Sequence, residues 1–189
     1  RGADVILMLP DRMGDGYGMH IPQIDRLHEQ GVTLVVTVDN GIAAAEEIAY
    51  AQSLGVDGVV TDHHIPPDAL PEAAAVVDPH RLDEESDFRD WAGVGVAFKL
   101  CCALEGCACE ELLPLYGDLV AIGTVADVVP LQRENRILVA KGLECLNQNP
   151  RPGIRALLSA AGMEGRQITS ETLGFSIGPR INAAGRMGD

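Results

Sequence analysis

The sequence lacks any apolar run close to the about 18 residues that a membrane-spanning helix needs, and it lacks the basic and apolar regions of a secretory signal. Aromatic residues make up only 4% of the 189 residues, and the 11 prolines and 21 glycines are spread along the chain. Apolar residues make up 47%, which is enough for a sizeable core and argues against wholesale disorder. We therefore expect one globular domain, or two small lobes, in the cytoplasm and without a membrane partner.

Cysteines are few, and they lack the paired C-x-x-C spacing of structural zinc sites. Their number, 5, is odd, which also argues against a disulfide scaffold. We expect reduced thiols packed in and just after a helix. The cysteines are Cys101, Cys102, Cys107, Cys109 and Cys145.

Basic residues are scarce in the first part of the chain. Residues 1–132 contain 6 Lys and Arg against 23 Asp and Glu, whereas residues 133–189 contain 8 against 5. A uniformly acidic protein would be a poor partner for nucleic acid, but bound divalent cations would offset part of an acidic front. The net charge of −14 therefore weighs only weakly against a polyanionic substrate.

Short β-branched runs alternate with amphipathic stretches over the first 80 residues. The pattern predicts strands at 5–9, 32–38, 56–61 and 73–77, and helices near 21–30 and 43–54. The continuous apolar run 32–38 is typical of a strand that is covered on both faces. This alternation predicts an α/β fold, with a mostly parallel sheet flanked by helices.

Polar side chains follow three of these predicted strands at the point where each strand ends. They are Asp39, then Asp62, His63 and His64, then Asp78 and His80. Since ligands bind outside the carboxyl ends of parallel strands, these side chains should converge.

Beyond the acidic segment 82–90, which should be a surface loop, the pattern becomes mainly helical. Helices are predicted near 93–105, 115–126, 136–147 and 152–161, followed by a glycine-rich stretch at 173–186. We divide the chain into an α/β part, residues 1–80, and a mainly helical part, residues 81–189.

Individually, the candidate site residues also have structural interpretations. Asp39-Asn40-Gly41 is a turn signal, and Asp127, in an apolar stretch, could cap a helix end. Imidazole with carboxylate suits Mn²⁺, Zn²⁺ or Fe²⁺, and carboxylates alone suit Mg²⁺. Arginine forks suit phosphate oxygens, although a glycine-rich surface loop is the alternative for Arg180, Asn182 and Arg186. Together these residues indicate metal-assisted phosphoester hydrolysis.

The motifs in their order resemble those of the DHH phosphoesterase superfamily. They are Val38–Gly41, Val60–His64 and Gly123–Leu131, and the tail Gly178–Met187 resembles the motif of the RecJ branch, whose members are single-strand-specific 5′→3′ DNA exonucleases. Leu9–Arg12 with Gly16–Gly18 is also similar to that branch. The resemblance covers essentially the whole chain.

This resemblance implies a role for each candidate residue and a cofactor. Asp39 would bridge two metal ions, Mn²⁺ or Mg²⁺, with His63 and Asp127 as further ligands and a metal-bound hydroxide as nucleophile. His64 would contact metal or the scissile phosphate, and Asp62 would orient a histidine. Arg180, Asn182 and Arg186 would contact substrate phosphate. Single-stranded DNA is the implied partner, in DNA repair or recombination, with single-strand-binding or other repair proteins as possible companions.

The sequence departs from the superfamily in one respect. An Asp-x-Asp motif on a first strand is missing, because Asp11 and Asp15 stand in a loop without that spacing. The superfamily's downstream substrate-binding domain is missing as well. We therefore expect an internal fragment that binds metal poorly and is inactive alone.

Two other functions fit the same motifs. The acidic front and the scarcity of aromatics would suit a DHH enzyme that acts on short oligonucleotides or nucleotide phosphates. A non-catalytic replication scaffold on the same fold is the second alternative, although such a chain should have lost its Asp and His motifs.

Overall fold

The computed structural model describes residues 2–9 and 18–187, with side chains up to residue 184. Its sheet has three parallel strands in the order β1 (Leu34–Val38), β2 (Asp57–Thr61) and β3 (Ala75–Val77). In the register, Val36 lies opposite Val59 and Val59 opposite Ala75, so all carboxyl ends meet at one edge. The predicted α/β class with a parallel sheet is confirmed.

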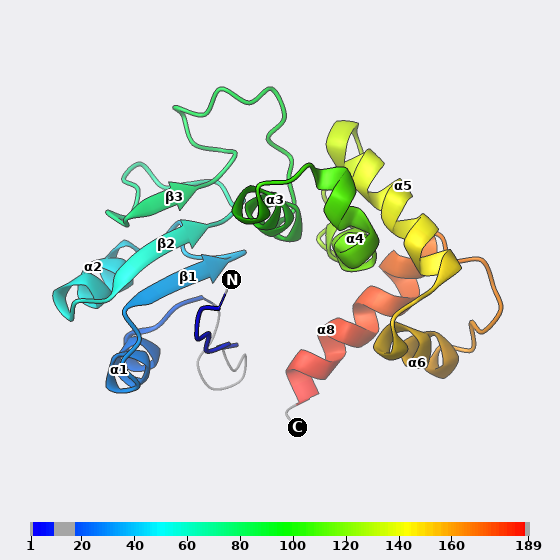
Figure 1. Ribbon diagram of the computed structural model, residues 1–189, viewed down its shortest axis with the longest axis horizontal. Helices are drawn as coiled ribbons and strands as arrows, with labels where there is room; N and C mark the ends of the chain where they lie inside the picture. The colour runs from blue at the N-terminus through cyan, green and yellow to red at the C-terminus, as the bar shows by residue number, and fades with distance from the viewer. Residues whose placement is uncertain (1, 10–17, 188–189) are drawn as a thin grey trace.

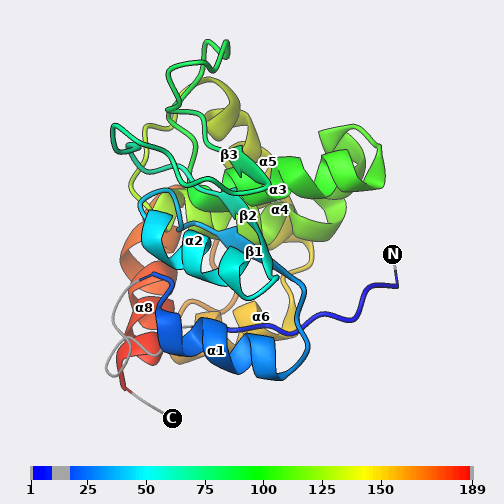
Figure 2. The same ribbon diagram turned by 90° about the vertical axis from the view of Figure 1, so that its left-hand side faces the viewer.

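Two helices cover one face of this sheet. They are α1 (Ile21–Glu29) and α2 (Ala45–Ser53), which Figure 2 shows in front of the strands. Ile24 and Ala51 are buried with Val56 between these helices and the sheet, and Val35 packs against this cluster. Gly58 belongs to the same face, where an added Cβ would lie 2.8 Å from Ile48.

The opposite face of β1 is open in the part of the chain that the structure describes. Leu34, Val36 and Val38 expose 50%, 46% and 47% of their surface. The prediction that this strand is covered on both faces is therefore wrong. An apolar run indicates high β propensity at every position, but it does not show which faces of the strand pack against other elements.

Residues 5–9 do not form the predicted strand either. They are extended without strand pairing, and Val5, Leu7 and Leu9 are more than three-quarters exposed. Leu7 and Leu9 line a cavity of about 380 Å³ with Val36 and Val38 of β1. A β-branched run becomes a strand only where a neighbouring strand accepts its hydrogen bonds.

The rest of the chain is helical and lies beyond the carboxyl edge of the sheet (Figure 1). The helix α3 adjoins the ends of β1 and β2, and α4 packs along α5. The helices are α3 (Gly93–Glu105), α4 (Cys109–Ala126), α5 (Arg133–Gln148), α6 (Pro152–Ala160), α7 (Ser170–Thr172) and α8 (Gly178–Met187), with the π-helical segment η1 (Leu173–Ile177) before α8. None of the helices in residues 2–9 and 18–187 is long and apolar enough to cross a bilayer.

Two buried clusters hold the helical part together. One contains Phe88, Trp91 and Phe98 beside α4, and the other joins Ala121 of α4 to Leu146, Ile154 and Leu173. The close approach of α4 and α5 depends on Gly142, whose added Cβ would lie 2.1 Å from the Gly117 carbonyl oxygen. The cysteines are free thiols, of which Cys102 is buried. The predicted mainly helical segment is confirmed, while the division at residue 80 stays a prediction.

Candidate metal centre

Asp39 follows β1 directly and has a left-handed backbone, with φ of 63°. Its N–H donates to the Thr61 carbonyl at 3.0 Å, so the turn remains attached to the neighbouring strand. The first residue of α3, Gly93, lies so close that an added Cβ would be 2.2 Å from Asp39 Oδ1. The positive end of the α3 dipole thereby faces the Asp39 carboxylate. Non-glycine residues in this backbone region are characteristic of functional sites.

Asp62 follows β2 and is only 1% exposed. Its Oδ2 accepts the N–H of Ile42 at 3.0 Å, and its Oδ1 accepts the N–H of His63 at 2.8 Å. The same Oδ1 lies 2.6 Å from His64 Nδ1. Although burial alone would raise the pKa of Asp62, these hydrogen bonds outweigh it and hold the pKa below its usual value.

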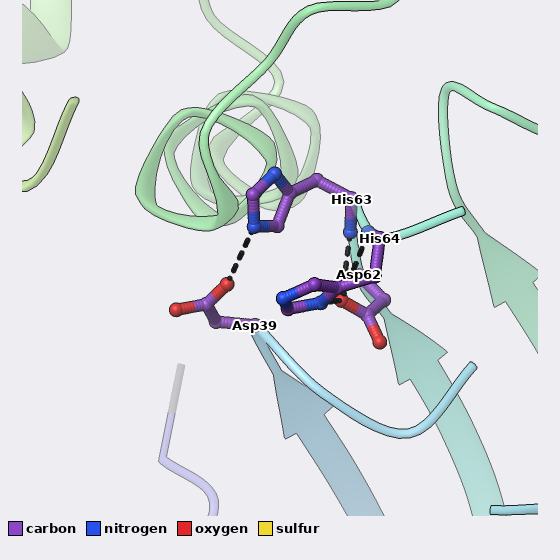
Figure 3. A group of neighbouring side chains, drawn as sticks. All are labelled: Asp39, Asp62, His63 and His64. Carbon is purple, nitrogen blue, oxygen red and sulfur yellow. Dashed lines mark hydrogen bonds and ion pairs between the residues drawn. The ribbon is translucent and has the colours of Figure 1, made fainter. Parts of the chain in front are cut away.

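The two histidines after Asp62 are oriented differently. His63 Nδ1 lies 2.7 Å from the Trp91 carbonyl oxygen, which leaves Nε2 facing the carboxylates. His64 is tied to Asp62 through Nδ1, and its outer nitrogen lies on the side of Asp39 in Figure 3. The ring centroids are 4.5 Å apart, so both rings border one space.

His63 Nε2 meets carboxylates from two other elements. It lies 3.0 Å from Asp39 Oδ1 and 3.4 Å from Asp127 Oδ2. The Asp39 carboxylate, opposed by burial and aided by Asp127, raises the pKa of His63 to about 9. A proton on this ring therefore balances the carboxylates when no cation does.

Asp127 comes from the end of α4, on the other side of the site from the sheet. Its N–H continues the helix by donating to the Gly123 carbonyl at 3.0 Å. Burial and the nearby Asp39 carboxylate raise the pKa of Asp127, against the opposing effect of His63. The next residue, Val128, has φ of 61°, an uncommon backbone for a β-branched side chain. The chain thus turns sharply after Asp127.

These side chains fit a divalent cation. Ligand atoms of Asp39, Asp62, His63 and His64 lie within 4.8 Å of one another. Asp39 Oδ1 and His63 Nε2 are buried, and neither has a hydrogen bond of good geometry despite their 3.0 Å separation. Buried polar atoms without such a partner are rare, and convergent acceptor atoms are a typical cation site. The oxygens of Asp62 already accept N–H groups, which leaves them less available than those of Asp39.

The third strand end does not join this group. Asp78 is 2% exposed, and its Oδ1 accepts the His80 N–H at 2.7 Å. Burial and, to a smaller extent, the nearby Asp62 carboxylate raise the pKa of Asp78. The expected convergence therefore holds for two strand ends, with Asp78 and His80 close by but outside the group of ligand atoms.

The predicted phosphate-binding residues lie on α8, which sequence analysis took for a glycine-rich stretch and not a helix. Arg180 and Asn182 are exposed, and Arg180 Nη1 donates to the Ser176 carbonyl at 2.8 Å. The first residue of α8, Gly178, packs against Ala126, next to Asp127. The backbone of Arg186 belongs to α8, and its side chain lies outside the described residues, as do Asp11 and Asp15.

Sequence analysis missed two residues that shape the centre, Trp91 and Gly93. Trp91 acts through its backbone carbonyl, and Gly93 acts by having no side chain beside Asp39. Neither contribution has a side-chain signature. The one available signal was the start of a predicted helix at residue 93.

The fold and site together define an α/β protein with an Asp/His cluster, suited to a divalent cation, at the carboxyl edge of a parallel sheet. Residues 1–124 match the family model described as the DHH family, N-terminal domain. The chain belongs to the DHH family.

Relatives that are named RecJ match almost the whole length of this chain. The single-stranded-DNA-specific exonuclease RecJ of Escherichia coli K12 is 42% identical over 99% of this chain, and that of Bacillus subtilis 168 is 44% identical over 98%. The chain covers 34% and 23% of these relatives, so it spans about a third of their length or less.

Solved structures agree with this likeness. A crystal structure of exonuclease RecJ bound to manganese matches with a TM-score of 0.83 and 37% identity, over 100% of this chain and 47% of that one. RecJ from Thermus thermophilus in complex with Mn²⁺ matches with a TM-score of 0.73 and 36% identity, over 88% of this chain and 25% of that one.

Proposed function

We propose that this chain carries the metal centre of a single-strand-specific DNA exonuclease that degrades its substrate from 5′ to 3′. The observation that carries the proposal is the meeting of Asp39, His63 and Asp127 from three separate elements around buried acceptor atoms that lack hydrogen-bond partners. The names of the relatives supply the substrate class. We expect the enzyme to act in the cytoplasm, in DNA repair or recombination and alongside single-strand-binding or other repair proteins.

The residues divide into ligands and groups that position them. Asp39, His63 and Asp127 would hold Mn²⁺ or Mg²⁺, which supplies a Lewis acid and lowers the pKa of water. Asp62 fixes the His64 ring because its Oδ1 accepts a hydrogen bond from the Nδ1–H, so that His64 Nε2 can face metal or the scissile phosphate. Arg180 and Asn182, with Arg186, would bind phosphate oxygens of the strand.

The proposed substrate is tested with the complete protein that the gene encodes, supplied with Mn²⁺. Long single-stranded DNA labelled at either end is digested in parallel with blunt duplex DNA and a dinucleotide. Release of mononucleotides from the 5′ end, with duplex spared, is the expected result. Cleavage of the dinucleotide alone would indicate an enzyme of short oligonucleotides, and no cleavage despite bound metal would indicate a scaffold.

Matched variants connect the activity to this centre. Asp39→Asn removes a proposed ligand, whereas Asp83→Asn removes a carboxylate that is 66% exposed and pairs with Arg81. We expect the first variant to lose cleavage at every Mn²⁺ concentration tested and the second to retain it. Equal activity of the two variants would contradict the assignment.

A further inference from the structure

Phe175 exposes 81% of its surface. The other phenylalanines, Phe88 and Phe98, and the single tryptophan, Trp91, are all less than 10% exposed. Tyr116 of α4 is also exposed, at 42%. In a chain with so few aromatics, an exposed phenylalanine ring is therefore the exception.

The backbone that carries Phe175 is firmly held. Phe175 lies in η1, between Leu173 and Ile177, which are both 0% exposed and belong to the cluster formed with α4, α5 and α6. Because the side chains of Leu173 and Ile177 are buried in the core, the exposed Phe175 ring points away from it. Single turns of π-helix occur often at functional sites.

The segment that carries Phe175 adjoins the end of α4, which bears a proposed metal ligand. Gly174 packs against Val125, and Gly178 packs against Ala126, so this helix touches the last turn of α4 just before Asp127. Residues three and four positions apart share a helix face. Phe175 lies between these two glycines in the chain, so its turn of the helix adjoins the turn of α4 that ends in a proposed metal ligand.

A cationic side chain lies one turn further along. Arg180 folds back onto the turn of Phe175, because its Nη1 donates to the Ser176 carbonyl at 2.8 Å. This segment is also the basic part of the chain, with 8 Lys and Arg against 5 Asp and Glu in residues 133–189. An exposed ring beside a guanidinium matches the base and the phosphate of a nucleotide.

We propose that Phe175 stacks on an unpaired base of the DNA strand near the scissile phosphate and thereby favours single-stranded over duplex substrate. The inference rests on the proposed function and deepens it. Stacking needs a free base face, which a single strand can offer by splaying the base out. In a duplex, neighbouring bases cover both faces of every base except the outer face of the terminal pair, so an internal base cannot make the contact.

The test measures binding separately from cleavage, with the complete encoded protein and Ca²⁺ in place of Mn²⁺. Oligonucleotides carry either a normal base or an abasic sugar at one of the first few positions from the 5′ end. The wild type should lose about 5- to 150-fold in affinity at the position that stacks, the range expected for one base on one ring. Phe175→Ala should bind the normal strand as weakly as the wild type binds the abasic strand, without discriminating between them.

Further variants separate stacking from structural effects. Phe175→Trp should restore both affinity and discrimination, and Tyr116→Ala, which removes another exposed ring of the described residues, should change neither. The proposal is overturned if Phe175→Ala binds like the wild type, or if it weakens binding of normal and abasic strands equally. Thermal unfolding of each variant shows that it is folded.

Failure of the stacking proposal and failure of the proposed activity give different results. If the wild type discriminates by base but cleaves no DNA with Mn²⁺, the exonuclease proposal fails and stacking stands. If it cleaves single strands but binds normal and abasic strands alike, stacking fails and the exonuclease proposal stands.

Discussion

Asp39 and Asp62 carry the same carboxylate in opposite surroundings. The Asp62 side chain is 2% exposed and accepts N–H groups on both oxygens, whereas the Asp39 side chain is 46% exposed and its buried Oδ1 has no well-directed hydrogen bond. The first arrangement fixes a carboxylate in place, and the second leaves an oxygen available to a cation. We therefore assign Asp62 to positioning and Asp39 to metal binding.

If Asp62 positions His64, Asp62→Asn should lower both the cleavage rate and the free energy of unfolding. The amide NH₂ would face N–H donors, which leaves buried groups unpaired and should cost about 1–3 kcal/mol of unfolding free energy. Loss of the His64 orientation should lower activity about 10- to 100-fold. Chemical denaturation and single-strand digestion measure the two effects, and Asp57→Asn, an exposed change at the start of β2, is the control. Unchanged activity in a folded Asp62→Asn protein would contradict this role.

The raised pKa of His63 predicts that metal binding depends on pH. With its pKa raised to about 9, the ring is protonated in the metal-free protein at neutral pH, and a protonated ring cannot be a ligand. Affinity for Mn²⁺ should therefore rise with pH, by up to about tenfold per unit, and level off above that pKa. Calorimetry in buffers of different ionisation enthalpy should show about one proton released per ion bound.

A matched variant checks the source of that proton. His63→Gln should bind Mn²⁺ weakly and without proton release, whereas His80→Gln should behave like the wild type. A proton count near zero for the wild type would contradict His63 as a ligand.

The residues of the centre differ in how far the sequence predicts them. Asp39, His63 and His64 were predictable because they follow strand patterns, and the ends of parallel strands meet. The positions of Trp91 and Gly93 were not, since they depend on where α3 packs. Local sequence does not encode that packing.

At the scale of elements, α3 determines where the Asp39 carboxylate lies. Its first residue, Gly93, approaches so closely that any Cβ would meet the Asp39 carboxylate. Glycine is needed at this position because the helix backbone lies close to the carboxylate, and not because of an unusual backbone angle. The first residue of α3 thus lies directly against the Asp39 carboxylate.

This contact predicts that Gly93→Ala lowers Mn²⁺ affinity by about tenfold or more, because the carboxylate must move away from the ring. Gly153→Ala in α6 is the matched control, since an added Cβ there meets nothing within 4 Å. The control should leave affinity unchanged and stability equal or slightly higher. Titration of both variants with Mn²⁺ compares them, and equal affinities would exclude this role of α3.

The sequence mispredicts two segments, and both errors have the same physical reason. The glycines and alanines of 173–186 indicate a loop by propensity, yet Gly174 and Gly178 allow this helix to approach Val125 and Ala126 closely. Residues 5–9 read as a strand by propensity, yet no strand pairs with them in the described part of the chain. In both cases tertiary contacts outweigh local preference.

At the scale of the whole molecule, the centre joins the α/β part to the helical part. The sheet provides Asp39 and His63, while α4 provides Asp127. Mn²⁺ prefers about six ligands, and a centre with two ions needs more carboxylates than these three groups supply. We therefore expect the 189-residue chain alone to bind Mn²⁺ at least about tenfold more weakly than the complete protein and to cleave no DNA.

Side-by-side titration and digestion with the two proteins test that expectation. Equal protein concentrations and the same labelled single strand make the rates comparable. Cleavage by the 189-residue chain at a rate near that of the complete protein would show that the described residues suffice.

A crystal structure of the complete protein with Mn²⁺, using anomalous scattering to locate the metal, tests the proposed ligands most directly. We expect a manganese peak within ligand distance of Asp39, His63 and Asp127, with Asp62 still hydrogen-bonded to His64. No peak there, or a peak coordinated by Asp62 and His64 without Asp39 and Asp127, would contradict this expectation.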